Sequence, residues 1–260
     1  MSWAAGRRLI ILLIVGAIAV AFLTVVLISA LYKTPSCTDG VQNQNEAGVD
    51  CGGPCAYLCT ALEQAPTVLF TKVLQNNDGR TDIIASVENK NVNAAAKNVP
   101  YRIVLYGEEQ SSLGELTGTI DLPPRTTMLV YLPGVAAGNQ KIVSAFLDIA
   151  ASAPQWFVLT VDSRVVPMVA NTTQSGTSET PRIEAVLTNP STSALSNVQV
   201  IVLVHDVRKT VIAASKTIVP TIPAQGQAVA TFTWNNAFPS VPASIEVVPI
   251  VPLPAQAGLP

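Results

Sequence analysis

The chain has 260 residues, of which 12% are charged and 49% are hydrophobic, and its formal net charge at pH 7 is -2. Charged residues are about half as frequent as in an ordinary soluble domain. No basic patch or polybasic tract is present to attract nucleic acid or anionic lipid. This composition excludes nucleic-acid binding as the expected function and leaves room for one large or two smaller domains.

The first long feature is an apolar run from Leu9 to Leu31 without a charged residue. As a helix, this run is long enough to cross a bilayer core of about 30 Å. Arg7 and Arg8 precede it and Lys33 is the single base just after it, so the positive-inside rule predicts a cytoplasmic stub, residues 1–8, and extracellular C-terminal domains. A cleaved signal peptide is the alternative, but its apolar core would span only about 7–15 residues. We therefore expect a single-pass protein of the cell membrane.

Four cysteines, Cys37, Cys51, Cys55 and Cys59, lie in one short stretch. An even, clustered set on the exported side of a membrane is typical of disulfides, and the spacing leaves three connectivities open. Zinc is the alternative, but gaps of 13, 3 and 3 residues lack the paired C-x₂-C hooks of ribbon-type sites. Because residues 37–59 are rich in turn formers and poor in apolar residues, we predict a small disulfide-stapled module.

Side chains with oxygen ligands lie between the first two cysteines, at Asp39, Asn43, Glu46 and Asp50. Hard oxygen ligands on a cross-linked loop are what Ca²⁺ prefers, so calcium is the one cofactor that the sequence suggests. The alternative is that these residues form turns and face solvent. The stretch resembles a C-x-D-G-x-x-N-x-x-E-x-G-V-D-C-G-G-x-C motif of exported bacterial and archaeal proteins, which implies export and no particular ligand.

From Pro66 onward, short runs of β-branched and aromatic residues alternate with clusters of Asn, Gly, Pro and Ser. This pattern predicts an all-β fold. Seven strands are expected first: Val68–Leu74, Asp82–Glu88, Val99–Tyr106, Gly114–Ile120, Thr126–Leu132, Lys141–Ile149 and Trp156–Val161. Their spacing suits a seven-stranded sandwich.

Alternation within the second of these strands predicts which side chains are buried. One set is expected to face the core and the other the solvent: Ile83, Ala85 and Val87 inward, and Asp82, Ser86 and Glu88 outward.

The pattern then repeats about 100 residues further along the chain. Ile83-x-Ala85-x-Val87-x-Asn89 recurs as Ile183-x-Ala185-x-Leu187-x-Asn189, and two further landmarks recur in the same order. We therefore predict two tandem sandwiches, residues 66–162 and 163–251, joined with almost no linker at Asp162-Ser163. A Pro-rich tail, residues 252–260, follows.

The run V-E-N…V-P-Y-R-I-V-L-Y-G…I-D-L-P-P and its partner in the second copy resemble immunoglobulin-like sandwiches of bacterial and archaeal surface proteins. The resemblance is in particular to the FxLyD-type and cell-adhesion-related (CARDB-type) domains. It implies two Ig-like β-sandwiches, and therefore a fold more than an activity.

Few residues outside the cysteine stretch suggest chemistry. His205 is the single histidine and precedes Asp206, but no activated nucleophile accompanies the pair, so we do not expect an enzyme. Trp156 and Trp234 are expected in the cores, with Trp156 also a candidate for the contact between the copies. Asn171-Thr172-Thr173, on a predicted polar loop, is a formal N-glycosylation acceptor.

The second copy has no counterpart of the strand Gln155–Val161 that ends the first copy. After Ser244–Ile250 the chain enters the Pro-rich tail, so the edge at Ser244, Ile245 and Val247 is expected to be open to a strand from a partner. The alternative is that the tail folds back as extended structure and covers this edge.

Together these features predict a membrane-anchored cell-surface protein that presents two Ig-like domains for adhesion, scaffolding or envelope assembly. Its expected partners are the membrane and other surface or envelope proteins, and no small-molecule substrate is evident. The alternative is an accessory or sensor subunit of a larger membrane complex, docked through the small residues Gly16, Ala17, Ala19 and Ala21.

Overall fold

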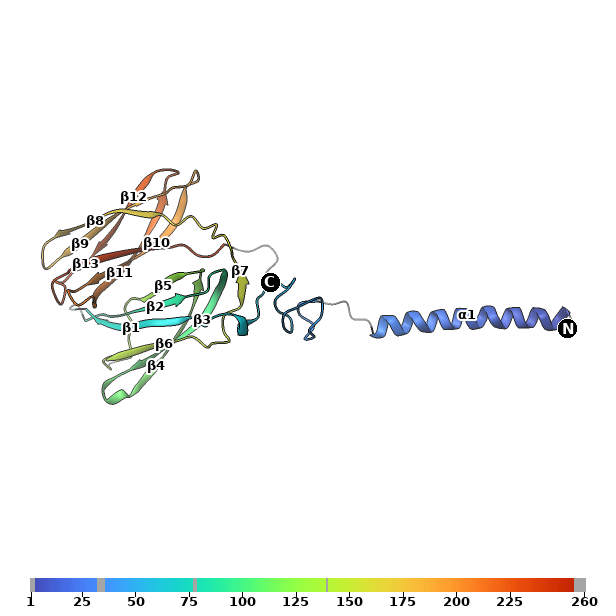
Figure 1. Cartoon of the computed structure of the whole chain (residues 1–260). Helices are drawn as coiled ribbons and strands as arrows, with labels where there is room; N and C mark the ends of the chain where they lie inside the picture. The colour runs from blue at the N-terminus through green and yellow to red at the C-terminus, as the bar shows by residue number, and fades with distance from the viewer. Residues whose placement is uncertain (1–2, 32–35, 77–78, 139, 255–260) are drawn as a thin grey trace. The chain divides into compact units, whose positions relative to one another are not determined.

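The computed structural model describes residues 3–31, 36–76, 79–138 and 140–254, and consists of one long helix and a body of β-strands (Figure 1). The chain divides into two compact units, Met1–Cys55 and Ala56–Pro260. The elements are α1 (Trp3–Leu31), η1 (Thr60–Leu62), β1 (Thr67–Gln75), β2 (Thr81–Asn89), β3 (Ala94–Tyr106), η2 (Glu108–Gln110), β4 (Ser112–Leu122), β5 (Thr126–Leu132), β6 (Ser144–Asp148), β7 (Trp156–Val158), β8 (Met168–Gly176), β9 (Pro181–Thr188), β10 (Leu195–His205), β11 (Val211–Ile222), β12 (Gln227–Thr233) and β13 (Ser244–Ile250). The all-β fold with an N-terminal helix is as predicted. Lys33 and positions 255–260 of the predicted tail lie outside the described residues.

The helix α1 contains a span, Gly6–Ser29, of 24 residues with mean hydropathy 3.2, which is long and apolar enough to cross a membrane. Its large side chains are exposed within its own unit; Leu12 and Phe22 are 70% and 68% exposed. The hydroxyl of Thr24 donates to the Val20 carbonyl at 2.6 Å, so this polar group is satisfied inside the helix. By length and composition alone, this helix can serve as a membrane span, and a signal sequence near the N-terminus would have the same features.

The first sandwich consists of the sheets β1-β2-β5 and β4-β3-β6, with β7 also paired to β3. Every pairing is antiparallel, and the core between the sheets includes Ile83, Val87, Ile103 and Leu122. All seven predicted strands are present, and β5 has the predicted bounds. The last strand, β7, ends at Val158 and not at Val161.

The second sandwich has the same strand order in its sheets β8-β9-β12 and β11-β10-β13, and the residues described up to 254 include no counterpart of β7. Its core includes Ile183, Leu187, Val202 and Phe232. The prediction of almost no linker at Asp162-Ser163 is wrong, because residues 159–167 separate β7 from β8. This segment carries Arg164, whose contacts are described below.

The second compact unit begins inside the predicted module 37–59, at Ala56. Residues 56–64 pack on the first sandwich: the Leu58 N–H donates to the Trp156 carbonyl at 2.7 Å. The side chain of Asn91 exchanges two hydrogen bonds of 2.8 Å with the backbone of Gln64. This end of the cysteine stretch is therefore part of the β-sheet body.

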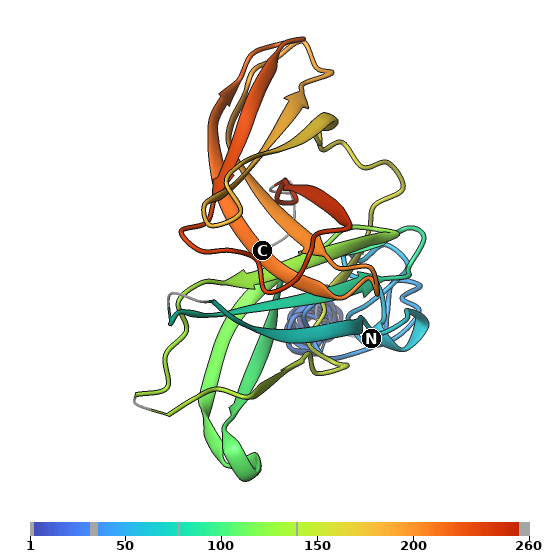
Figure 2. The same cartoon turned by 90° about the vertical axis from the view of Figure 1, so that its left-hand side faces the viewer.

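The outer face of β1-β2-β5 is covered by the second sandwich, whose strands lie above it in Figure 2. Asp82 and Ser86 are 1% and 2% exposed, so the prediction that they face solvent is wrong; Glu88 is half-buried. The cause is a second apolar cluster on that face. Its buried members are Leu74, Ile84, Leu129 and Tyr131 from the first sandwich and Ile201, Leu203, Val211 and Ala214 from the second.

The equivalent face of the second sandwich is polar at the matching central positions. Ile84 pairs with Tyr131 across β2 and β5, whereas Glu184 pairs with Thr231 across β9 and β12. Glu184 also forms an ion pair with Arg182, at 2.6 Å. The apolar face that joins the two sandwiches is therefore not repeated in the second one.

Candidate functional site

All four cysteines are in disulfides. Cys37 is bonded to Cys55, with a Cα–Cα distance of 5.7 Å. Cys51 and Cys59 are also disulfide-bonded, and no cysteine is free. The predicted disulfides are confirmed, and the Cys37–Cys55 bond selects among the three connectivities that the spacing left open. Zinc is contradicted, because a disulfide sulfur is not a thiolate ligand.

The acidic side chains of the loop bind backbone amides. The Asp50 carboxylate accepts the N–H groups of Asp39 and Gly40 at 3.0 and 2.9 Å. The Asp39 carboxylate accepts the N–H of Val41 and the side-chain amide of Asn43, both at 2.9 Å. These bonds hold tight turns, which is the alternative that the sequence left open.

Glu46 is 6% exposed and accepts the N–H groups of Asn43 and Asp50, both at 3.2 Å. Its other oxygen lies 3.0 Å from the Cys55 sulfur. Among the described residues, Glu46 clusters as a possible metal ligand only with Cys37 and Cys55, and their disulfide removes both sulfurs from the ligand set. Calcium binding at this loop therefore has no support in the structure.

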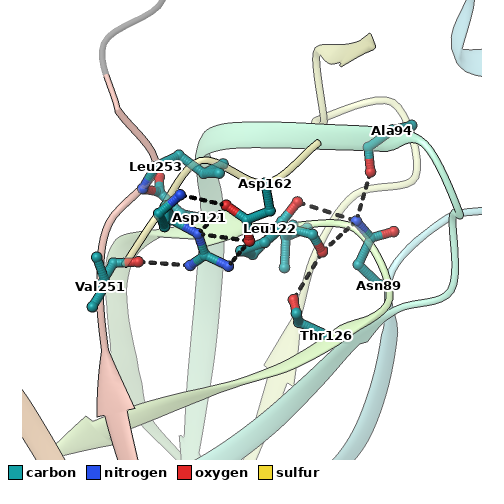
Figure 3. Close-up of polar contacts among 10 residues, drawn as sticks. Asn89, Ala94, Asp121, Leu122, Thr126, Asp162, Val251 and Leu253 are labelled. Carbon is teal, nitrogen blue, oxygen red and sulfur yellow. Dashed lines mark hydrogen bonds and ion pairs between the residues drawn. The ribbon is translucent and has the colours of Figure 1, made fainter. Parts of the chain in front are cut away.

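A buried asparagine joins the two sheets at one end of each sandwich. The Asn89 amide donates to the carbonyls of Ala94, Leu122 and Pro123 at 2.9, 3.1 and 2.8 Å (Figure 3). Its oxygen accepts the Asn91 N–H at 3.0 Å. In the second sandwich the Asn189 amide makes the corresponding bonds, to Ser193, Ile222 and Pro223 at 2.8, 3.3 and 3.0 Å, and accepts the Ser191 N–H at 3.0 Å. The repeated asparagine is therefore a structural residue.

A polar cluster lies at the interface of the two sandwiches. The Asp82 carboxylate accepts hydrogen bonds, each of 2.8 Å, from the Tyr131 hydroxyl, the Asn76 amide and the Gly134 N–H. Burial raises the pKa of the Tyr131 hydroxyl, and the hydrogen bond to Asp82 raises it further. The same hydroxyl lies 3.3 Å from the Ala214 carbonyl of the second sandwich. The apolar pairs Ile83-Ile84 and Leu129-Val130 were the sequence signal for this two-faced burial.

Arg164 lies in the linker between the sandwiches, residues 159–167, and connects this linker to the residue that follows β13. Its guanidinium forms a bidentate pair with Asp162, with bonds of 3.0 and 2.7 Å, and donates to the Val251 carbonyl at 2.7 Å. The side chain of Arg164 is 5% exposed. Its hydrogen bonds hold the pKa of Asp162 below the ordinary value, against a smaller opposing effect of burial. No sequence pattern predicted this contact.

The first residues of the predicted tail return to the first sandwich. The Leu253 N–H donates to the Asp121 carboxylate at 2.7 Å (Figure 3). Leu253 is 3% exposed and packs with Ala95 and Phe157. In its described part, 252–254, the tail therefore forms no strand beside β13.

The predicted edge at Ser244, Ile245 and Val247 belongs to β13, which pairs with β10 as the edge strand of its sheet. Ser244 is exposed, whereas Ile245 and Val247 are half-buried against the core. The strand also carries Glu246 and Pro249, residue types that discourage strand addition. Partner binding at this edge stays a prediction.

His205 and Asp206, the remaining candidates for chemistry, make contacts that stabilise the fold. His205 Nε2 lies 3.2 Å from the Glu246 carboxylate, while Asp206 accepts the N–H groups of Thr210 and Arg208 at 2.8 and 2.9 Å. The hydrogen bond from Thr210 contributes most to lowering the pKa of Asp206, and the bond from Arg208 adds to it. Asp206 therefore stabilises a turn and is not hydrogen-bonded to His205.

Trp156 and Trp234 are in the cores, as predicted. Trp156 is 0% exposed within the first core and is not a member of the cluster between the sandwiches. Trp234 packs on Phe238 in the second core, with ring centroids 5.0 Å apart. Asn171 is exposed, but it lies in β8 and not in the predicted loop.

These contacts define an all-β protein with one N-terminal helix apolar enough to span a membrane and a disulfide-linked loop. Comparison with known proteins finds no family model that matches the chain and no curated protein that matches it.

Proposed function

We propose that the chain is a membrane-anchored cell-surface protein that presents two Ig-like β-sandwiches, as one stiff body, for adhesion, scaffolding or envelope assembly. The membrane and other surface or envelope proteins are its proposed partners, with its N-terminus cytoplasmic and its C-terminal domains extracellular. It acts by presenting surface, without catalytic turnover.

One observation carries this proposal. The two sandwiches bury a shared cluster of apolar side chains between them, around Ile84 and Tyr131 on one side and Ile201 and Leu203 on the other. Domains joined only by a linker are expected to move relative to one another, whereas a large apolar interface holds them at one angle. Two sandwiches that are held rigidly together and follow an apolar helix in the chain suit a protein whose binding surface must stand away from the membrane.

The disulfides give a second, independent support. Disulfides persist in oxidising compartments and are rare in the cytosol. Because the cysteine loop follows the apolar helix directly in the chain, the two features together favour export of everything after the helix.

Protease treatment of intact cells tests the topology. Added protease is expected to digest the sandwiches of the full-length protein while a cytoplasmic control protein survives. Sandwiches that resist until the membrane is broken would show that the topology is reversed. The mass of the protein extracted from membranes tests the anchor, because signal-peptide cleavage would remove α1.

Affinity purification of the native protein from detergent extracts separates the two functional classes. Surface or envelope proteins as partners support presentation. A co-purifying integral membrane complex that depends on α1 supports the accessory-subunit alternative instead.

A further inference from the structure

The strand β8 (Met168–Gly176) is the most exposed strand of the second sandwich. It pairs with β9 alone, and eight of its nine residues are exposed. The equivalent strand of the first sandwich, β1, is mostly half-buried. One edge of β8 therefore presents backbone N–H and C=O groups that no other strand of its sheet uses.

The first sandwich shows how this edge is closed elsewhere in the same chain. There the Leu147 N–H of β6 donates to the Thr71 hydroxyl of β1 at 3.0 Å, and the Gln75 amide donates to the Ile142 carbonyl at 2.7 Å. No hydrogen bond joins β8 to β13, the equivalent strands, both of which the structure describes. The two sheets of the second sandwich are therefore not linked along this side.

The side chains explain the difference. Opposite Ile183 of the second core, β8 places Gln174, whereas β1 places Val73 opposite the equivalent Ile83. A polar residue at this position gains little from packing into the core, so β8 is held mainly by its ladder to β9.

The exposed edge of β8 lacks the charged and proline residues that usually discourage strand addition, and its one irregularity is the register shift between Val169 and Asn171. Natural edge strands carry lysine, other charges or proline. β1 carries Lys72, and β13 carries Glu246 and Pro249, whereas β8 has no charged residue and no proline.

The two ends of β8 complement each other. At its C-terminal end, Gln174, Ser175 and Gly176 line a cleft of about 660 Å³ whose opposite wall includes Phe238, Val241 and Pro242. At its N-terminal end, Met168 and Val169 are apolar and 57% and 37% exposed. An antiparallel second β8 would bring its apolar end to this cleft.

We propose that β8 is the interface between two copies of this chain, paired antiparallel across a twofold axis near Thr172. The pairing joins two three-stranded sheets into one continuous sheet and is regular at residues 171–173. Beyond the irregularity at Ala170, it brings Met168 and Val169 of each copy toward Gly176 and Ser175 of the other. The contact is isologous, so it closes as a dimer. It places no like charges opposite one another, and it brings threonines together, a favourable cross-strand pairing.

The dimer goes beyond the proposed function, because it specifies an interaction between copies whatever the protein binds at the surface. Anchoring in one membrane would raise the effective concentration of copies for each other.

Cysteine cross-linking of the full chain in membranes tests the register. Because every native cysteine is in a disulfide, a single introduced cysteine is the only thiol. Cysteine is placed in turn at Asn171, Thr172, Thr173, Gln174 and Ser175, and the yield of oxidised dimer is measured. A twofold axis predicts a sharp maximum within 171–173, about tenfold above the control Thr117→Cys on the edge strand β4, because disulfides need close Cβ atoms. A flat profile, or yields equal to the control, overturns the proposal.

Introducing a charge at the exposed Thr173 provides the second test. Thr173→Glu alone and Thr173→Lys alone are each expected to weaken the dimer in nanodiscs, because the two like charges become diagonal neighbours on one face of the joined sheet. Co-expression of the two variants is expected to restore it as a mixed dimer, which also shows that both chains fold. A dimer that survives both single variants is held by another surface, such as α1, and refutes the assignment.

Discussion

The Tyr131 hydroxyl offers a measurement of how much the buried polar cluster at the interface of the sandwiches contributes to stability. Tyr131→Phe removes one oxygen atom and leaves the ring in place. The Asp82 carboxylate then keeps two of its three hydrogen-bond donors. Because a hydrogen bond to a charged group contributes about 1.5–3 kcal/mol, we expect the free energy of unfolding to fall by about 2 kcal/mol.

A matched control is available in the same chain. Tyr101 is 8% exposed and Tyr131 is 9% exposed, so the two rings are equally buried. Within the described residues the Tyr101 hydroxyl makes no hydrogen bond, so Tyr101→Phe should change the free energy of unfolding by less than about 0.5 kcal/mol.

Urea unfolding of the full chain in detergent micelles, followed by tryptophan fluorescence, measures both values. Trp3 is first replaced, which leaves Trp156 to report on the first sandwich and Trp234 on the second. Variants retaining one or the other then show each transition separately. With a tight interface, both probes should report one transition, shifted by Tyr131→Phe. Equal effects of the two Tyr→Phe substitutions, or two separate transitions in the parent protein, would refute the reasoning.

Three further predictions follow from the contacts. Asn89→Ala and Asn189→Ala should each lower the free energy of unfolding by about 3 kcal/mol, because each leaves several buried backbone groups unsatisfied. The control Asn171→Ala, on exposed β8, should have almost no effect in the same urea assay. The pKa of Asp162 is lowered in the folded state, so its contribution to stability is present above the ordinary value of 3.8 and is lost as the pH falls through the lower folded pKa. Asp162→Asn should reduce the acid dependence of the urea midpoint, and an unchanged pH profile would contradict the role of the Arg164 pair. Alkylation of the native, unreduced protein should add no mass, whereas alkylation after reduction should modify all four cysteines; four modified cysteines without reduction would rule out the disulfides.

The positions of the strands were readable from the sequence because they depend on local pattern. β5 has the predicted bounds, and the alternation in β2 correctly placed Ile83, Ala85 and Val87 in the core. The disulfides were predictable for a similar reason, because four clustered cysteines carry their own chemical signal. Which cysteine pairs with which was not predictable, because the pairing depends on how the loop turns around Asp39 and Asp50.

What faces the second side of a sheet depends on contacts between residues far apart in the chain. The alternation in β2 predicted solvent at Asp82 and Ser86, but both are buried on the face where apolar side chains of the two sandwiches form a shared cluster. Alternation reports which face is buried within one sandwich and carries no information about a neighbouring sandwich.

The sequence by itself therefore determined the class of fold, the apolar helix, the disulfide-linked loop and the approximate strand positions, because each rests on residue types and spacing over a few turns or strands. The tertiary structure alone decided that the two sandwiches share a buried face, that Arg164 and Leu253 tie the end of the chain back, and that β8 is left with an open edge. These features depend on contacts between segments far apart in the chain. Such contacts are determined by the packing of the folded domains and not by any local sequence pattern.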